Sequence, residues 1–511
     1  MTTSRRRAAL ATLAGSTASI LIVSVQAVVL VPFYLHAIGP RLYGAWLGSG
    51  DILVWMQAFD LGLPNLMIQR IGAAYGRQDL RGAAECFAAG MAALALVALV
   101  VVAGGLAISH PLPRWMGLVG AESGTLQACF VVGTIATALN IFGNGIVGFS
   151  RGIQRTTFMN GVTVASGLVG FGVSLGLVLT GWGLWAVALG LVARSGISLI
   201  GSIVFAAVCL RGDLYHFFRV RRAVLREFLA ISPATALGGI GYAVMNQSEV
   251  ALTAILLSPE LAVVLGLTRK ALDMARGLVD AIAFSTYGGF AHLVTSDQRH
   301  RALHVHAEIH SLRLSLAIAM ASAYMAVNGS LLSVWVGSTQ YGGALLTILM
   351  AVQFIVVGSS FLMNYLYRAT GQVMRGSLAL FLEGVTRVPL MIGLLLWVGL
   401  PGIPIAGIIT SGVFGWLAYR WMRREVQSFS DPPPSLSLRA AAGQVAILGI
   451  GALACILVRW ETWIYVLIAG SAIAIGGEIA LIHLDPSLRD VRASLGAGLS
   501  RLRAASIHQR G

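Results

Sequence analysis

The stretch LGLTRKALDMARGLVDAIAFSTY, residues 265–287, places five charged side chains inside a long apolar run. In a helix, four of the five charges share one face, because they fall at positions i, i+4, i+7 and i+11: Arg269, Asp273, Arg276 and Asp280. The fifth charge is Lys270, the only lysine of the chain. The apolar run around them predicts a helix that crosses a membrane while carrying its own charges.

These charges would lie deep in the hydrocarbon. Counted from Leu261 at ~1.5 Å per residue, Arg269 lies ~12 Å and Arg276 ~22 Å into a hydrocarbon core that is ~30 Å thick. Such charges must face a cavity or one another. One interpretation is an ion-pair ladder, in which Asp273 pairs with Lys270 or Arg276, and Asp280 with Arg276. The other is a cationic, partly compensated wall of a hydrated cavity that receives an anionic substrate.

Composition indicates the class of protein. Of the 511 residues, 57% are hydrophobic and 11% charged, and the mean hydropathy is +0.82, whereas soluble proteins carry about 25% charged residues. The net charge of +15 comes almost entirely from arginines in short loops between apolar segments. That distribution is typical of membrane orientation and not of a nucleic-acid-binding surface. The sequence therefore predicts an all-α polytopic membrane protein.

Apolar segments separated by proline, glycine and arginine predict about fourteen transmembrane helices. We expect them at 9–37, 43–75, 82–108, 123–150, 156–180, 183–210, 226–257, 261–292, 303–336, 341–369, 374–398, 403–424, 439–458 and 462–484. The first apolar run has no convincing cleavage site, so we interpret it as a spanning helix and not as a removed signal peptide.

The loop arginines predict the orientation. One side of the predicted topology carries nearly all of them, including the N-terminal arginines, the 211–226 loop and the basic tail, whereas the other side has only Arg41, Arg114 and Arg459. Arg299, Arg301 and Arg313 also count toward the arginine-rich side. The asymmetry predicts that both termini are cytoplasmic.

An internal repeat divides the chain. Residues recur in the same order at offsets near 220: Gln26 and Gln247, Gly44 and Gly266, Trp115 and Trp335, Gly117 and Gly337, Arg151 and Arg368. Two six-helix lobes related by pseudo-two-fold symmetry are expected, with a substrate path between them. The predicted ranges are an N-terminal lobe 1–210, a basic cytoplasmic linker 211–225, a C-terminal lobe 226–425, a linker with two extra helices 426–484, and a basic cytoplasmic tail 485–511.

Several local patterns carry a family resemblance. They are AIGPRLYGAW (37–46), FDLGLPNLMIQRIGAAYGR (59–77), GFSRGIQRT (148–156), NQSEVALTAILLSPELAVVLGLTRKA (246–271) and YLYRATGQ (365–372). In this order they resemble the polysaccharide-transporter family, whose members include oligosaccharide flippases. That family is part of the multidrug/oligosaccharidyl-lipid/polysaccharide exporter superfamily. The resemblance extends over roughly residues 9–425.

The resemblance implies a function. Members of the family export a polyprenyl-diphosphate-linked oligosaccharide, such as an O-antigen or exopolysaccharide repeat unit, across the bacterial inner membrane by alternating access. By position, Arg269, Lys270 and Arg276 correspond to basic residues that handle the diphosphate in relatives, and Glu249 to an acidic residue of the seventh helix. The chain departs from the family in two ways: it has Tyr287 before a glycine where many relatives have proline, and it has fourteen predicted helices where many have twelve.

Further charges are predicted within the membrane. Arg194 and Arg387 are additional candidates for substrate binding, but Glu383 lies one turn before Arg387 and favours a structural pair there. Asp51 and Glu249 have no obvious local partner, so each could carry a proton, bind sodium or serve structure; Asp273 and Asp280 are the other coupling or structural acids.

Asp60 is a further acid that is predicted to be buried, but its side chain can cap the local break in the helix at residues 62–64. His304, His306 and His310 approach metal-ligand spacing, but we predict a solvated helix face there and no metal site.

The sequence shows no enzyme constellation. We therefore expect neither an enzyme nor a cofactor. The sequence also has no Walker-A loop, so we do not expect ATP to be the direct energy source. The expected partners are the lipid-linked oligosaccharide, membrane lipids, a coupling proton or sodium ion, and a glycan polymerase and glycosyltransferases, with no nucleic acid. Two alternatives stay open. A cation-coupled multidrug or small-molecule exporter predicts a cavity richer in acids and aromatic residues, and a non-transporting scaffold of a glycan-assembly complex predicts mutually neutralised charges.

Overall fold

A computed structural model of the chain describes residues 25–60, 62–209, 220–296, 299–426, 437–489 and 491–493. Within these ranges all regular structure is helical, and ten helices are long and apolar enough to cross a membrane. The chain is a multi-pass membrane protein, as predicted. The N-terminal arginines, most of the 211–225 linker, the 430–435 segment and the tail from residue 494 lie outside the described residues.

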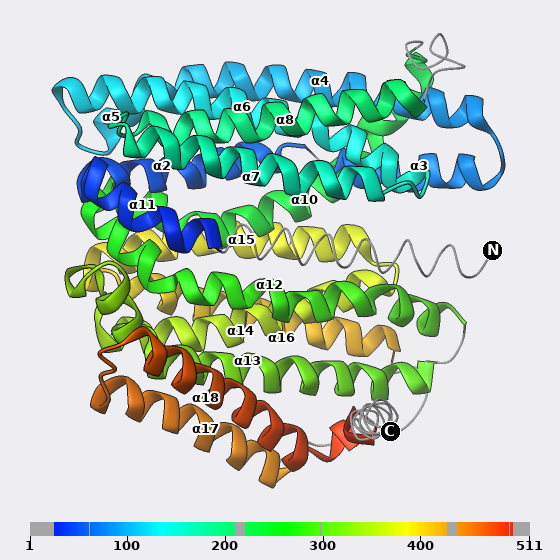
Figure 1. Ribbon diagram of the computed structural model, residues 1–511. Coiled ribbons are helices and arrows are strands. Elements are labelled where there is room, and N and C mark those ends of the chain that lie inside the picture. The colour runs from blue at the N-terminus through cyan, green and yellow to red at the C-terminus, as the bar shows by residue number, and fades with distance from the viewer. Residues whose placement is uncertain are drawn as a thin grey trace, which may run out of the picture. The chain divides into compact units, whose positions relative to one another are not determined.

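The helices form two compact units, Met1–Val263 and Val264–Gly511 (Figure 1). After a helix at Val25–Ile38, the first unit contains α2 (Pro40–Ala58), α3 (Leu63–Gly76), α4 (Leu80–Ser109), α5 (Leu112–Trp115), α6 (Gly120–Gly152), α7 (Thr157–Leu179), α8 (Trp185–Cys209), α10 (Arg222–Gln247) and α11 (Glu249–Leu256).

The second unit contains most of α12 (Pro259–Thr295), then α13 (Arg299–Trp335), η1 (Ser338–Gln340), α14 (Gly343–Ala369), α15 (Val373–Val398), α16 (Gly402–Val426), α17 (Leu438–Leu457), α18 (Trp463–Leu484) and η2 (Pro486–Leu488). The internal repeat predicts a linker between the two six-helix lobes at residues 211–225. That boundary stays a prediction.

Small residues let the helices approach closely. Between α7 and α8, a Cβ at Gly190 would overlap Ser174 Oγ, and one at Gly170 would lie 2.8 Å from Arg194 Cβ. Between α4 and α6, a Cβ at Gly105 would overlap the side chain of Thr134. Because lipid offers no hydrophobic driving force between helices, such close packing is a main source of their association.

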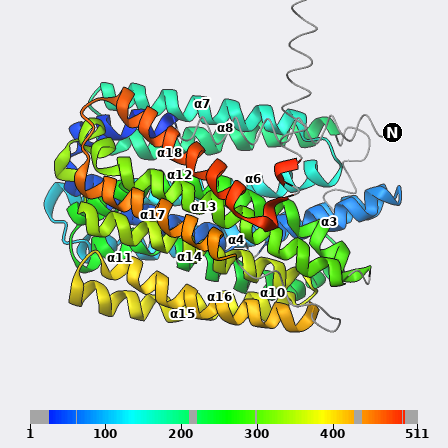
Figure 2. The same cartoon turned by 90° about the horizontal axis from the view of Figure 1, so that it is seen from below.

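The two extra helices pack against the second unit. Figures 1 and 2 place α17 and α18 beside α13, and Ser322 Oγ of α13 donates a 2.7 Å hydrogen bond to the Ile447 carbonyl of α17. Large apolar side chains of the pair, such as Leu457 and Ile464, are exposed. These side chains form a surface suited to lipid.

The fourteen predicted helices correspond to the observed order with two breaks. The predicted helix 43–75 is two helices, α2 and α3, because Gly62 adopts a left-handed φ of 69°. Asp60 Oδ1 accepts a 2.9 Å hydrogen bond from the Gly62 amide, which confirms the predicted cap. The predicted helix 226–257 is also two helices, α10 and α11, which meet at Ser248.

One pair of positions in the predicted repeat has the same backbone conformation in both halves of the chain. Gly117 and Gly337, which the sequence aligns at an offset of 220, both adopt left-handed φ angles, 66° and 98°. Each follows the tryptophan that ends a helix, Trp115 of α5 and Trp335 of α13. A side chain with a Cβ disfavours this conformation, so glycine is needed at both turns.

The predicted orientation can be tested by cysteine labelling. In a variant that lacks the four native cysteines, we expect Ala121→Cys and Thr339→Cys to react with a membrane-impermeant maleimide from the periplasm, and Ser296→Cys to react only after lysis. All three side chains are exposed. Labelling of Ser296→Cys in intact spheroplasts would contradict the cytoplasmic termini.

Candidate functional site

The charged face of α12 begins with a local ion pair. Arg269 Nε donates a 3.0 Å hydrogen bond to Asp273 Oδ2 one helical turn away. The two side chains are 13% and 31% exposed, so the pair is partly enclosed. The sequence had proposed Lys270 or Arg276 as the partner of Asp273, and the structure adds Arg269. The pair fixes one guanidinium on the predicted face.

The other end of this face is held by a neighbouring helix. Arg313 of α13 places Nη2 3.8 Å from Asp280 Oδ1, and its Nη1 donates to Ser359 Oγ of α14 at 3.3 Å. The Arg313 side chain is only 1% exposed, and its guanidinium occupies the space that a Cβ at Gly358 would need. Counting Arg313 among the loop arginines is therefore wrong, because the residue lies well inside α13.

Cations outnumber carboxylates among the side chains named for this face. Four are cationic and two are acidic: Arg269, Lys270, Arg276 and Arg313 against Asp273 and Asp280. Lys270 and Arg276 are neither fully buried nor fully exposed. A fixed excess of positive charge in a low-dielectric region favours an anion. The structure thus brings all five predicted charges of α12 onto one helix and adds Arg313.

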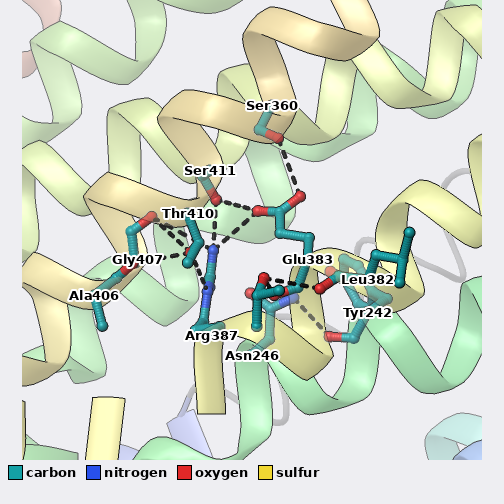
Figure 3. Close-up of polar contacts among 11 residues, drawn as sticks. Tyr242, Asn246, Ser360, Leu382, Glu383, Arg387, Ala406, Gly407, Thr410 and Ser411 are labelled. Carbon is teal, nitrogen blue, oxygen red and sulfur yellow. Dashed lines mark hydrogen bonds and ion pairs between the residues drawn. The ribbon is translucent and has the colours of Figure 1, made fainter. Parts of the chain in front are cut away.

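Arg387 is enclosed in a polar network of the second unit (Figure 3). Its Nη2 donates to Glu383 Oε1 at 3.0 Å and its Nε to Thr410 Oγ1 at 3.0 Å. Ser411 Oγ bonds both members of the pair, and Ser360 Oγ donates to Glu383 Oε2 at 3.3 Å. Both charged side chains are 1% exposed. This confirms the predicted structural pair; binding of a substrate by Arg387 would require the network to open.

Arg194 contrasts with Arg387. It lies in α8, packed beside Gly170 of α7, and is partly buried. Across the parts of the chain that the structure describes, its side chain forms no hydrogen bond or ion pair. A cation without a protein partner inside a membrane helix is costly, so functional contact with an anion is the default interpretation.

Asp51 holds the start of α11. Its Oδ2 accepts hydrogen bonds from the amides of Val250 and Ala251, at 3.0 and 3.1 Å, and the side chain is buried. The approach needs a small residue on α2, because a Cβ at Gly48 would lie 2.9 Å from Ala254 Cβ. A carboxylate at a helix N-terminus is stabilised by free amides and by the helix dipole.

This contact also locates Glu249, the first residue of α11, which is buried beside the same helix start. Whether Asp51 or Glu249 exchanges a cation stays a prediction. The structure gives Asp51 a partner that local sequence could not show, since the two segments lie about 200 residues apart.

The Asp51 contact predicts a measurable loss of stability. Asp51→Ala should lower the free energy of unfolding by about 1–2 kcal/mol, because the amides of Val250 and Ala251 lose their acceptor. Asp51→Asn should lose less, since its amide oxygen still accepts. The measurement is thermal unfolding in detergent, with Asp79→Ala as a matched loss of an exposed cap that accepts from Gly82. An Asp51→Ala variant as stable as wild type would contradict the contact.

The histidines of α13 differ from expectation. His306 is 6% exposed and its Nε2 lies 3.2 Å from Met363 Sδ, so the predicted solvated face is wrong at this residue. In the part of the chain that the structure describes, no group of three or more histidine, cysteine, aspartate or glutamate side chains is placed to hold a metal ion.

Comparison with known proteins identifies the fold. No family model and no curated protein sequence matches the chain. Solved structures do match: a mutant of the Vibrio cholerae MATE transporter VcmN has a TM-score of 0.61 at 13% identity, over 84% of this chain and 99% of that one. An inward-facing multidrug resistance MATE family transporter of the MOP superfamily has a TM-score of 0.58 at 14% identity, over 80% and 98%.

A third match is a MOP superfamily transporter from Pyrococcus furiosus, whose description proposes a different function from the reversed polarity of its binding pocket. Its TM-score is 0.55 at 14% identity, over 82% of this chain and 93% of that one. At these identities the likeness establishes the fold, which is that of MATE transporters. The expected fold class is thereby confirmed, whereas the substrate follows only from the site.

Proposed function

We propose that the chain is an exporter that works by alternating access and carries a polyprenyl-diphosphate-linked oligosaccharide across a bacterial inner membrane, with both termini in the cytoplasm. The observation that carries the proposal is the excess of positive charge on the α12 face. The MATE fold supports the transport mechanism, since solved proteins of that fold are transporters. The expected substrate is an O-antigen or exopolysaccharide repeat unit.

The charge arrangement suits a diphosphate. Moving such a dianion through ~30 Å of hydrocarbon without help is prohibitive, because each desolvated charge costs many kcal/mol. Arginine matches phosphate with two parallel N–H donors in a rigid fork. Asp273 pairs with Arg269 and Asp280 with Arg313, so the two carboxylates offset only two of the four cations named for this face. A substrate at this face would meet more cationic than anionic side chains.

The second candidate is a cation-coupled exporter of drugs or other small molecules. Two of the neighbours are described as MATE family transporters, and one of these as a multidrug resistance protein. Buried acids Asp51 and Glu249 favour this candidate, because organic cations need carboxylates. The α12 face opposes it, since excess positive charge repels a cationic drug. Either candidate makes the chain a transporter and not an enzyme.

Binding in nanodiscs tests the proposal. We expect polyprenyl diphosphate to bind the purified protein at least about tenfold more tightly than polyprenyl monophosphate, since one more charge-assisted contact contributes ~1.5–3 kcal/mol. A cationic dye such as ethidium should bind more weakly than either. Tighter binding of ethidium than of the diphosphate would instead support the drug exporter, and binding of neither would support the non-transporting scaffold.

A further inference from the structure

A separate cavity lies within the second unit. It has a volume of about 460 Å³ and is lined by the last turns of α13, Tyr341 and the connection between α17 and α18. Trp335 and Trp463 flank this end of the helices, which is where tryptophans gather at a membrane–water interface. The residues of the α12 face do not line this cavity.

The rim of the cavity carries two opposite charges. Arg459 and Glu461 both line it, and both are exposed. Among the described residues, neither side chain forms an ion pair or a hydrogen bond. Two opposite charges that are held close in sequence yet unpaired are complementary to a ligand that carries both signs.

Trp460 adds a donor without a partner. Its backbone amide donates a 2.8 Å hydrogen bond to Ser330 Oγ of α13, which holds the residue against the cavity. Its indole Nε1 is buried and forms no hydrogen bond within the described chain. An unsatisfied buried N–H costs about 1–3 kcal/mol, so a ligand oxygen that accepts from it would be favoured.

The remainder of the lining is amphipathic. Met325, Val334 and Val458 supply apolar walls, and Ser333 and Tyr341 supply a hydroxyl and an aromatic ring. Next to the cavity, α17 exposes Leu453, Ile456 and Leu457 on the surface suited to lipid. A polar cavity that borders an apolar helix surface fits a molecule with a charged head and a hydrocarbon chain.

We propose that this cavity binds a membrane phospholipid whose headgroup carries both a phosphate and an ammonium. Arg459 and the Trp460 indole N–H receive the phosphate, and Glu461 receives the ammonium, with the ring of Tyr341 available as a second cation-binding surface. The acyl chains lie along α17. This site is independent of the transported substrate and would anchor α17 and α18 to α13.

Lipid retention measured by native mass spectrometry tests the site. The full chain is purified from vesicles that contain equal amounts of phosphatidylethanolamine and phosphatidylglycerol. We expect wild type to retain phosphatidylethanolamine about fivefold over phosphatidylglycerol, as one additional ion pair provides. Glu461→Gln should abolish the preference, and Arg459→Gln should lower retention of both lipids. Glu122→Gln, at a half-buried position in the first turn of α6, is the matched control and should retain the preference.

A second measurement keeps the test independent of folding. Photoactivatable phosphatidylethanolamine added to wild type should crosslink to peptides from α13 and the α17–α18 connection. Equal retention of the two lipids by wild type, an unchanged preference in Glu461→Gln, or crosslinks confined to other segments would overturn the proposal. Displacement of the crosslink by a free oligosaccharide, but not by phosphatidylethanolamine, would also overturn it and would indicate a glycan site.

Discussion

Replacing Arg387 with methionine should lower the free energy of unfolding by about 3–5 kcal/mol, because it leaves the buried carboxylate of Glu383 without its countercharge. The double change Glu383→Gln with Arg387→Met should recover most of that loss, since no buried charge then remains. The measurement is denaturant-induced unfolding in detergent micelles, followed for the single and double variants.

Arg194→Met is the matched control for this experiment. It removes a partly buried arginine from another membrane helix, but one that forms no ion pair in the described chain, so its cost should be below about 1 kcal/mol. Two results would contradict the network of Figure 3: an Arg387→Met variant with wild-type stability, or a double variant no more stable than the single one.

Arg276→Ala should reduce export at least about tenfold while the protein still reaches the membrane. The expected loss corresponds to one charge-assisted contact with phosphate, ~1.5–3 kcal/mol. Arg276→Lys should recover only part, because it keeps the charge and loses the planar fork. Export is measured with a labelled lipid-linked oligosaccharide, and membrane abundance is measured in the same cells.

Exchanging the charges of the 3.0 Å pair separates a structural ladder from a substrate site. The variant with Arg269→Asp and Asp273→Arg preserves the attraction but moves the guanidinium by one turn, ~6 Å along α12. A ladder that only joins helices should tolerate the exchange. A substrate site should not, so we expect normal stability and strongly reduced export. Full export by this variant would favour the scaffold.

Local sequence was sufficient to predict contacts within one or two turns. The cap at Asp60 and the pair of Glu383 with Arg387 were both predicted, because residues at i+2 and i+4 meet whatever the tertiary fold. The helix order followed from hydropathy, since a membrane allows few alternatives to a spanning helix.

Contacts between distant segments were not predictable. Asp51 meets Val250 from 199 residues away, and the break at Ser248 has no proline or glycine to signal it. Arg313 was assigned to a loop, because its charge resembled the orientation signal and its partner Asp280 lies on another helix. Arginine thus both sets the orientation of helices in the membrane and forms buried ion pairs. Only the packing of the helices distinguishes the two roles.

The most direct test of the central claim is transport by the purified protein in proteoliposomes. The substrate is a polyprenyl-diphosphate oligosaccharide with a fluorescent sugar, and its arrival in the opposite leaflet is measured by quenching from outside. We predict translocation by wild type, loss of it in Arg276→Ala, and no transport of ethidium under the same gradients. Transport of ethidium without movement of the lipid-linked oligosaccharide would contradict the account.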